Sequence, residues 1–119
     1  MSEPIHRHHT NARMSKIVRH RGLIYLCGQT AAGSAATDIT EQTKEVLSRV
    51  DTLLGEAGSD RTHLISAVIH LRSMADFTAM NVAWEAWIPQ GMAPARTTVE
   101  ARLAWPGLLV EITAIAAEA

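Results

Sequence analysis

The chain has 119 residues, which is enough for one domain with a modest hydrophobic core. Hydrophobic residues make up 47% and charged residues 19%, a balance typical of folded globular proteins and unlike that of disordered chains. The net charge of −1 shows no basic surplus, which disfavours a nucleic-acid-binding protein.

A single cysteine, Cys27, excludes a disulfide within the chain and fits a reducing compartment. The N-terminus is polar and has no apolar signal core, and no run of residues is long and apolar enough to cross a bilayer. We therefore expect a cytoplasmic protein without a membrane partner.

The first third of the chain predicts an arm, a hairpin and a loop. Residues 1–12 are polar and histidine-rich, and we expect them to form a loosely held arm rather than a metal site. Residues 16–21 and 23–28 are β-rich runs that flank Gly22 and predict a hairpin. The second run is nearly all apolar, so we expect it to be buried on both faces. The small residues of 29–37 predict a loop.

A helix is expected to begin at Thr37 or Asp38. Asp38 followed by Glu41 resembles a capping box, with aspartate in place of serine or threonine. Apolar residues then recur at three- and four-residue spacing and form one stripe: Val46, Leu47, Val50, Leu53 and Leu54. Gly55 or Gly58 is suited to end this helix through a left-handed cap.

The remainder of the chain predicts one more helix between strands. Residues 62–72 read as a strand, and Ser73 and Asp76 offer N-terminal caps for the second helix. The apolar face of that helix would be formed by Phe77, Met80, Trp84 and Trp87 or Ile88. Residues 95–103 and 108–116 are two further β-rich runs.

The resulting order, β-β-α-β-α-β-β, predicts a single α+β domain over residues 1–119. Both helices are amphipathic, and the simplest arrangement packs them on one face of a single mixed sheet. The opposite face would then be bare, although strands 62–72 and 108–116 are too apolar to remain in water. We therefore expect a second subunit to cover it.

Arg96 begins a strand and is the first candidate for chemistry. By period-two alternation Arg96, Thr98, Glu100 and Arg102 point to one side of that strand. An arginine at a strand end can bind a carboxylate through two parallel hydrogen bonds. The alternative is a surface arginine in a salt bridge.

Glu111 interrupts an otherwise apolar strand and is the second candidate. A carboxylate that is partly buried must be paired, or its proton affinity rises, which suits a general acid or base. The alternative is a structural ion pair. Cys27, in an apolar run, is either an inert buried thiol or a thiol that faces a cleft.

Three blocks of the sequence together resemble the RidA/YjgF family. They are Leu26-Cys27-Gly28-Gln29-Thr30, Pro94-Ala95-Arg96-Thr97-Thr98-Val99-Glu100 and Val110-Glu111-Ile112-Thr113-Ala114-Ile115-Ala116. The resemblance implies a chorismate-mutase-like fold that assembles as a homotrimer around a central barrel, with ligand clefts between subunits. Archetypal members hydrolyse enamines and imines to 2-keto acids and ammonia without a metal or cofactor.

The resemblance also assigns roles to positions of this chain. Arg96 matches the arginine that binds the substrate carboxylate, and Glu111 matches the glutamate that places or activates water. Gly28 and Gln29 match the turn that lines the cleft, and Asn81 matches an asparagine on the second helix.

Three positions depart from the family archetype. Met14 replaces a tyrosine, Cys27 replaces a serine, and Thr98 replaces a cysteine beside the arginine. Carboxylate binding is compatible with these changes, but activation of water is weakened because a methionine side chain cannot hold a water as a hydroxyl does.

Three functional hypotheses follow. The first is an imine or enamine deaminase, and the second is a non-catalytic trimer that binds a keto acid through Arg96. The third is a ribonuclease, an activity attached by name to some relatives, which the neutral charge and the lack of aromatic stacking residues disfavour.

Overall fold

The computed structural model describes residues 3–119 as a sheet of six strands with two α-helices. Two single turns of 3-10 helix, Arg61–His63 and Met74–Asp76, precede β4 and α2. In chain order the main elements are β1 (His6–Thr10), β2 (Ser15–His20), β3 (Leu23–Leu26), α1 (Ile39–Glu56), β4 (Leu64–Leu71), α2 (Phe77–Trp87), β5 (Ala95–Glu100) and β6 (Val110–Ala117).

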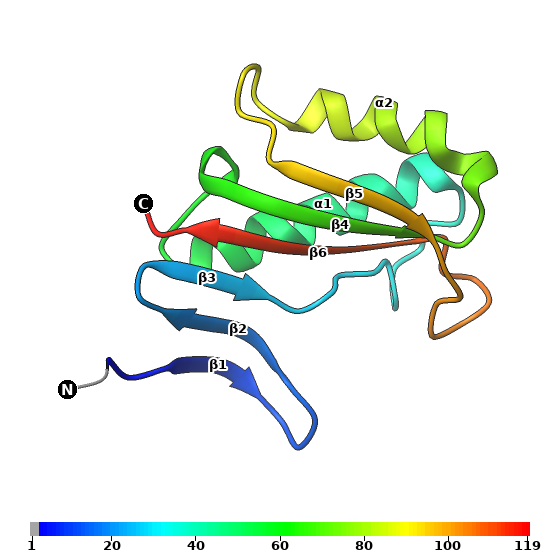
Figure 1. Ribbon diagram of the computed structural model, residues 1–119. Helices are drawn as coiled ribbons and strands as arrows, with labels where there is room; N and C mark the ends of the chain where they lie inside the picture. The colour runs from blue at the N-terminus through cyan, green and yellow to red at the C-terminus, as the bar shows by residue number, and fades with distance from the viewer. Residues whose placement is uncertain (1–2) are drawn as a thin grey trace.

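The sheet is mixed, with the strand order β1-β2-β3-β6-β4-β5. Only β4 and β5 pair in parallel, because α2 carries the chain back between them, and the other neighbours are antiparallel. Figure 1 shows both helices on the same side of the sheet. The prediction of two helices on one face of a mixed sheet is therefore confirmed.

The ends of α1 follow from its sequence. The Asp38 side chain accepts a hydrogen bond of 2.8 Å from the Glu41 backbone N–H, which satisfies one free donor of the first turn. Gly58 follows the helix with φ of +79°, a conformation that glycine adopts without steric cost, so this residue ends the helix rather than Gly55. The predicted apolar stripe is buried as expected.

The core lies between the helices and alternate residues of the central strands. On β6 these are Val110, Ile112, Ala114 and Ala116, and all are at most 3% exposed. On β4 the corresponding positions are Ala67, Ile69 and Leu71. Period-two alternation therefore assigns one face of each strand to the helices and leaves the other face open.

The open face of the sheet carries apolar side chains. Tyr25 on β3 and Val99 on β5 are 41% and 40% exposed. The prediction that residues 23–28 are buried on both faces is wrong for one chain, because no element of the chain packs on the Tyr25 side within the described residues. This is the face for which the sequence predicts a second subunit, and that cover remains a prediction.

The histidine-rich segment differs from its prediction. Residues His6–Thr10 form the edge strand β1, paired antiparallel with β2, so the expectation of a loose arm over residues 1–12 is wrong for this stretch. His9 Nε2 also lies 2.5 Å from Glu56 Oε2. An edge strand held by backbone pairing needs no alternation of apolar residues. The polar sequence of β1 therefore carries no pattern that predicts a strand. Residues 1–2 lie outside the described residues.

Within residues 3–119, neither helix combines the length and hydropathy needed to cross a membrane. A cytoplasmic location remains a prediction.

Candidate functional site

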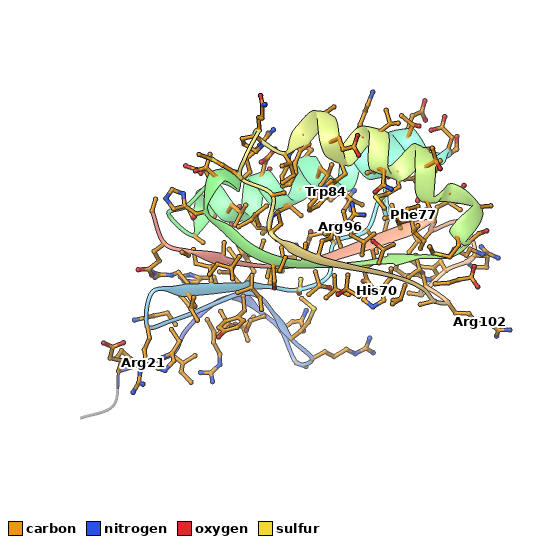
Figure 2. All side chains as sticks on the ribbon, turned by 45° about the horizontal axis from the view of Figure 1, so that its top comes forward. Arg21, His70, Phe77, Trp84, Arg96 and Arg102 are labelled. Atoms are coloured by element: carbon orange, nitrogen blue, oxygen red, sulfur yellow. The ribbon has the colours of Figure 1, made fainter. Side chains whose placement is uncertain are left out.

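Arg96 lies on the helix side of β5, at the outer edge of the sheet. It pairs in register with Ala67 of β4, whose side chain faces the core. Its guanidinium carbon lies 5.4 Å from the ring centroid of Trp84 and 5.9 Å from that of Phe77. Figure 2 shows these three side chains together on the helix side. Arg96 is thus held by two aromatic rings of α2.

The guanidinium of Arg96 has no acidic partner. Among the residues that the structure describes, none of the ion pairs and none of the side-chain hydrogen bonds involves this residue. The alternative of a surface salt bridge therefore does not apply within one chain. A half-buried cation that is stacked but unpaired retains its donors for a ligand.

Two further predicted residues lie on the same side with unsatisfied polar atoms. Thr98 follows Arg96 by two residues and faces the same side of β5, as the alternation predicted. Asn81 lies one helical turn from Phe77 and from Trp84 on α2. The side-chain oxygens of Asn81 and Thr98 are both buried without a hydrogen-bond partner. Such atoms are rare in native structures and need an explanation, such as a ligand.

Glu111 lies on the opposite, open side of the sheet. It pairs across strands with His70 of β4, and both side chains alternate with core residues. Figure 2 shows His70 on the side of the sheet away from the helices. Within the described residues Glu111 has no ion-pair partner, so the structural ion pair considered for it is absent from the chain.

The carboxylate of Glu111 occupies the space beside Gly28. A Cβ atom on Gly28 would lie 2.7 Å from Glu111 Oε2 and 2.9 Å from its Cδ. Real Cβ atoms do not approach so closely, so any larger residue at position 28 would displace the Glu111 carboxylate from this place. This contact joins the first of the three sequence blocks, which contains Gly28, to the third, which contains Glu111.

Gln29 fixes the turn next to Glu111. Its backbone N–H and C=O both bond to Ile112 of β6, at 2.9 and 3.0 Å. Its side-chain Nε2 donates to Cys27 O at 3.1 Å and lies 3.2 Å from Cys27 Sγ. Cys27, Gly28 and Gln29 therefore form one rigid group against β6.

Burial raises the pKa of the Cys27 thiol above its ordinary value of 9.0. The hydrogen bond from Gln29 and the charge of Lys16 oppose this shift, and the charge of Glu111 adds to it. The thiol is protonated at neutral pH, which is unlike an activated nucleophile.

Met14 lies on the turn between β1 and β2, where its backbone N–H donates to the Asn11 side chain. It is 38% exposed. Because Cys27 N bonds to Lys16 O, the antiparallel pairing places this turn at the same end of the sheet as Gly28. The predicted residues therefore form two groups in one chain: Arg96, Asn81 and Thr98 on the helix side, and Met14, Cys27, Gly28, Gln29 and Glu111 at the open side or its end.

Sequence reasoning missed three side chains beside these groups. The sequence predicts Phe77 and Trp84 on the apolar face of the second helix, and their spacing with Asn81 places all three on the stripe that faces Arg96. His70 was missed because its pairing with Glu111 depends on the strand register, which no local pattern reveals.

The comparisons with known proteins agree with the fold. A family model described as Endoribonuclease L-PSP matches residues 4–118. A RutC family protein of Haemophilus influenzae is 41% identical over 106 residues, covering 89% of this chain and 91% of that protein. The Escherichia coli K12 RutC family protein YoaB is 40% identical over 106 residues with the same coverage.

A solved structure extends the match to three dimensions. NMB1025 of Neisseria meningitidis, a member of the YjgF protein family, is 42% identical with a TM-score of 0.94, covering 98% of this chain and 96% of that chain. The six-stranded sheet with two helices on one face is therefore a YjgF-like fold. Since the family model spans nearly the whole chain, this protein belongs to the RidA/YjgF family, also described as endoribonuclease L-PSP and RutC.

Proposed function

We propose that this protein binds small carboxylate metabolites in clefts between subunits of a homotrimer and hydrolyses imines or enamines to 2-keto acids and ammonia. The observation that carries the proposal is the environment of the Arg96 side chain. Its guanidinium is half-buried between two aromatic rings, has no acidic partner in the described chain, and shares its side of the sheet with two unsatisfied oxygens.

The chemistry of this group suits a planar acid. A carboxylate can accept two parallel N–H bonds from the guanidinium, and the rings of Phe77 and Trp84, with centroids 5.9 and 5.4 Å from its central carbon, lie beside it. Thr98 Oγ1 can donate or accept a further hydrogen bond, and Asn81 Oδ1 can accept one from an N–H of the ligand. A 2-imino or 2-amino acid carries both a carboxylate and an N–H.

A second subunit would complete the cleft. Glu111 lies on the opposite side of the sheet from Arg96, so a ligand held by Arg96 must meet the Glu111 of another copy. The apolar open face supplies a surface for that contact. A closed ring of three copies would form three equivalent clefts.

The proposed reaction needs one acid–base group. An enamine first takes a proton from solvent at its β-carbon and becomes an iminium, whose C=N carbon is electrophilic. A water adds to that carbon as Glu111 accepts its proton, and the C=N electron pair moves to nitrogen. Glu111 returns the proton to the amine, the C–N bond breaks, and the hydroxyl loses its proton to solvent as the keto group forms. Arg96 holds the carboxylate throughout.

The alternative is a non-catalytic keto-acid-binding trimer. Met14 cannot hydrogen-bond a water as a hydroxyl would, and the Cys27 thiol remains protonated at neutral pH. Glu111 of the second copy would therefore be the only strong proton acceptor among the residues proposed for the cleft, which makes catalysis less well supported than binding. Arg96 binds the ligand carboxylate in the same way in both functions.

A ribonuclease activity, to which the family description refers, has less support in this chain. The net charge is −1, so no general attraction to phosphates is expected.

One experiment separates the enzyme from the binder. An amino acid oxidase generates imines in situ, and their decay is followed with and without this protein. Acceleration that is lost in both Arg96→Ala and Glu111→Ala supports the deaminase. No acceleration, together with pyruvate binding that Arg96→Ala abolishes, supports the binder. The absence of both effects contradicts the proposal. Sedimentation should give roughly three times the 12.9 kDa chain mass.

A further inference from the structure

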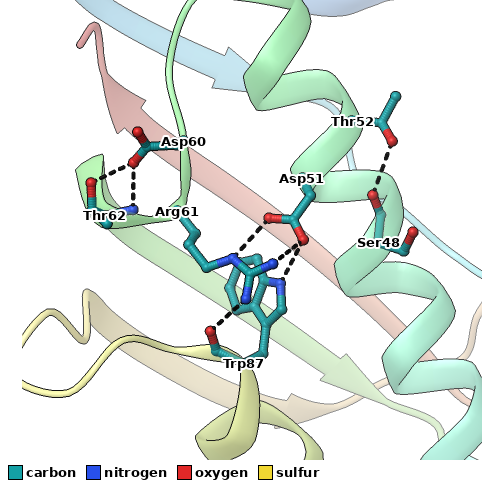
Figure 3. Close-up of polar contacts among 7 residues, drawn as sticks. All are labelled: Ser48, Asp51, Thr52, Asp60, Arg61, Thr62 and Trp87. Carbon is teal, nitrogen blue, oxygen red and sulfur yellow. Dashed lines mark hydrogen bonds and ion pairs between the residues drawn. The ribbon is translucent and has the colours of Figure 1, made fainter.

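A charged cluster outside the proposed cleft holds one indole ring. Asp51 of α1 accepts a hydrogen bond of 2.9 Å from Trp87 Nε1 at the end of α2. The same carboxylate binds the Arg61 guanidinium at two points, Nε to Oδ1 at 3.1 Å and Nη2 to Oδ2 at 2.5 Å. Figure 3 shows this arrangement. The two-point geometry fixes the carboxylate oxygen that accepts the hydrogen bond from the indole N–H.

Arg61 holds Trp87 in two further ways. Its guanidinium carbon lies 4.8 Å from the centroid of the Trp87 ring, and its Nη1 donates to the Trp87 carbonyl oxygen at 2.9 Å. That carbonyl is at the last residue of α2, where no intrahelical donor remains. The ring is therefore fixed at its N–H, at its face and through its own backbone.

The fixed ring contacts the residue that stacks on Arg96. The ring centroids of Trp87 and Trp84 are 5.7 Å apart with a tilt of 48°. Trp84 is only 5% exposed, and its ring lies 5.4 Å from the guanidinium of Arg96. The order of contact is Asp51, Arg61, Trp87, Trp84 and Arg96. Close packing limits rotation at each step.

We propose that Asp51 and Arg61 are positioning residues for carboxylate binding, acting through the Trp87–Trp84 ring pair on the orientation of the Arg96 guanidinium. This inference rests on the proposed role of Arg96. Neither residue touches the ligand. Their partly exposed ion pair would add little to stability alone, so its geometry has its main effect on Trp87.

Three variants separate the orientation of the ring from stability. Asp51→Asn keeps an acceptor for the indole N–H but loses the charge that pairs with Arg61. Asp51→Leu loses both. Arg61→Lys keeps the charge but loses the planar fork and the stacking on Trp87. Glu118→Gln is the matched control, because it breaks another partly exposed ion pair, with Arg19, away from the ring pair.

Three measurements are made on each full-length variant. Calorimetric titration with pyruvate gives the affinity of the Arg96 site. Far-ultraviolet circular dichroism gives the exciton couplet of the tilted Trp84–Trp87 pair, with Trp87→Phe as the zero reference. A melting curve records stability alongside them.

We expect Asp51→Leu to lose most of the couplet and to bind pyruvate roughly three- to tenfold more weakly. Arg61→Lys should change both in the same direction by less, and Asp51→Asn and Glu118→Gln should retain both even where they melt earlier. The inference is overturned if pyruvate affinity falls in proportion to the melting temperature across the variants. It is also overturned if Asp51→Leu or Arg61→Lys loses the couplet but binds pyruvate with unchanged affinity. A wild-type protein that does not bind pyruvate contradicts the proposed function itself and removes the basis of this inference.

Discussion

Arg96 and Glu111 lie on opposite faces of one sheet, although both strands that carry them flank β4. Arg96 aligns with Ala67 and Ala114, whose side chains face the helices, whereas Glu111 aligns with His70 and faces away from them. The two candidate residues therefore cannot act on one ligand from the same chain. A cleft that used both residues would need two copies of the chain, as in the proposed trimer.

Substitution of Gly28 tests the placement of Glu111. In Gly28→Ala the new Cβ would lie 2.7 Å from Glu111 Oε2, and the flexible carboxylate must move away. We expect imine hydrolysis to fall about tenfold or more, because a displaced base no longer reaches its water. Pyruvate affinity and melting temperature should change little, since Arg96 and the core are untouched.

Gly55→Ala provides the control for that variant. A Cβ at Gly55 meets no atom within 4 Å, and alanine favours the helix in which Gly55 lies. This control should melt slightly higher and hydrolyse imines at the wild-type rate. Full activity in Gly28→Ala would contradict the role assigned to Glu111.

The buried hydroxyl of Thr98 should serve binding and not stability. Its Oγ1 has no partner in the described chain, so Thr98→Val exchanges an unsatisfied oxygen for a methyl group of similar shape. We expect the free energy of unfolding to stay constant or to rise by up to about 1 kcal/mol. Pyruvate affinity, measured by calorimetry, should fall about tenfold, as for the loss of a hydrogen bond to a charged group.

Thr97→Val is the matched control for Thr98→Val, because Thr97 is exposed on the opposite side of the same strand. It should leave pyruvate affinity unchanged. Equal affinity in both variants would show that the Thr98 hydroxyl does not contact the ligand. A large loss of stability in Thr98→Val alone would show that this hydroxyl has a structural partner.

The thiol of Cys27 should react slowly at neutral pH. Burial raises its pKa above 9.0, so the reactive thiolate is scarce and increases only as the pH rises past that value. Iodoacetamide should therefore modify the native protein more slowly than the unfolded chain at the same pH. In Glu111→Gln the neighbouring negative charge that raises the pKa is gone, and alkylation should become somewhat faster. Rapid modification of the native protein at neutral pH would show a lowered pKa instead.

The sequence predicted those parts of the fold that local chemistry decides. Asp38 and Gly58 are cap residues whose properties do not depend on the remainder of the chain, and the apolar stripe of α1 is a helical period. The polar edge strand β1 escaped prediction, because its pairing with β2 uses the backbone and leaves no apolar alternation.

The sequence names the candidate site residues individually, but it does not predict how they are arranged. Alternation along β5 correctly grouped Arg96 with Thr98. The relation between Arg96 and Glu111 depends on two strand registers, and a shift of one residue in either would reverse it. Likewise Trp84 was expected in the core, and it is buried, yet one face of its ring also supports Arg96.

Subunit mixing tests most directly whether two chains build each cleft. Arg96→Ala and Glu111→Gln are each expected to be inactive in imine hydrolysis as pure proteins. Equal amounts of the two variants are unfolded together and refolded. If the copies assemble at random, about one cleft in four combines an intact Arg96 from one copy with an intact Glu111 from its neighbour. We predict recovery of about a quarter of the wild-type rate in the mixture. A mixture that stays inactive, while wild-type protein refolded in the same way is active, would contradict the shared cleft.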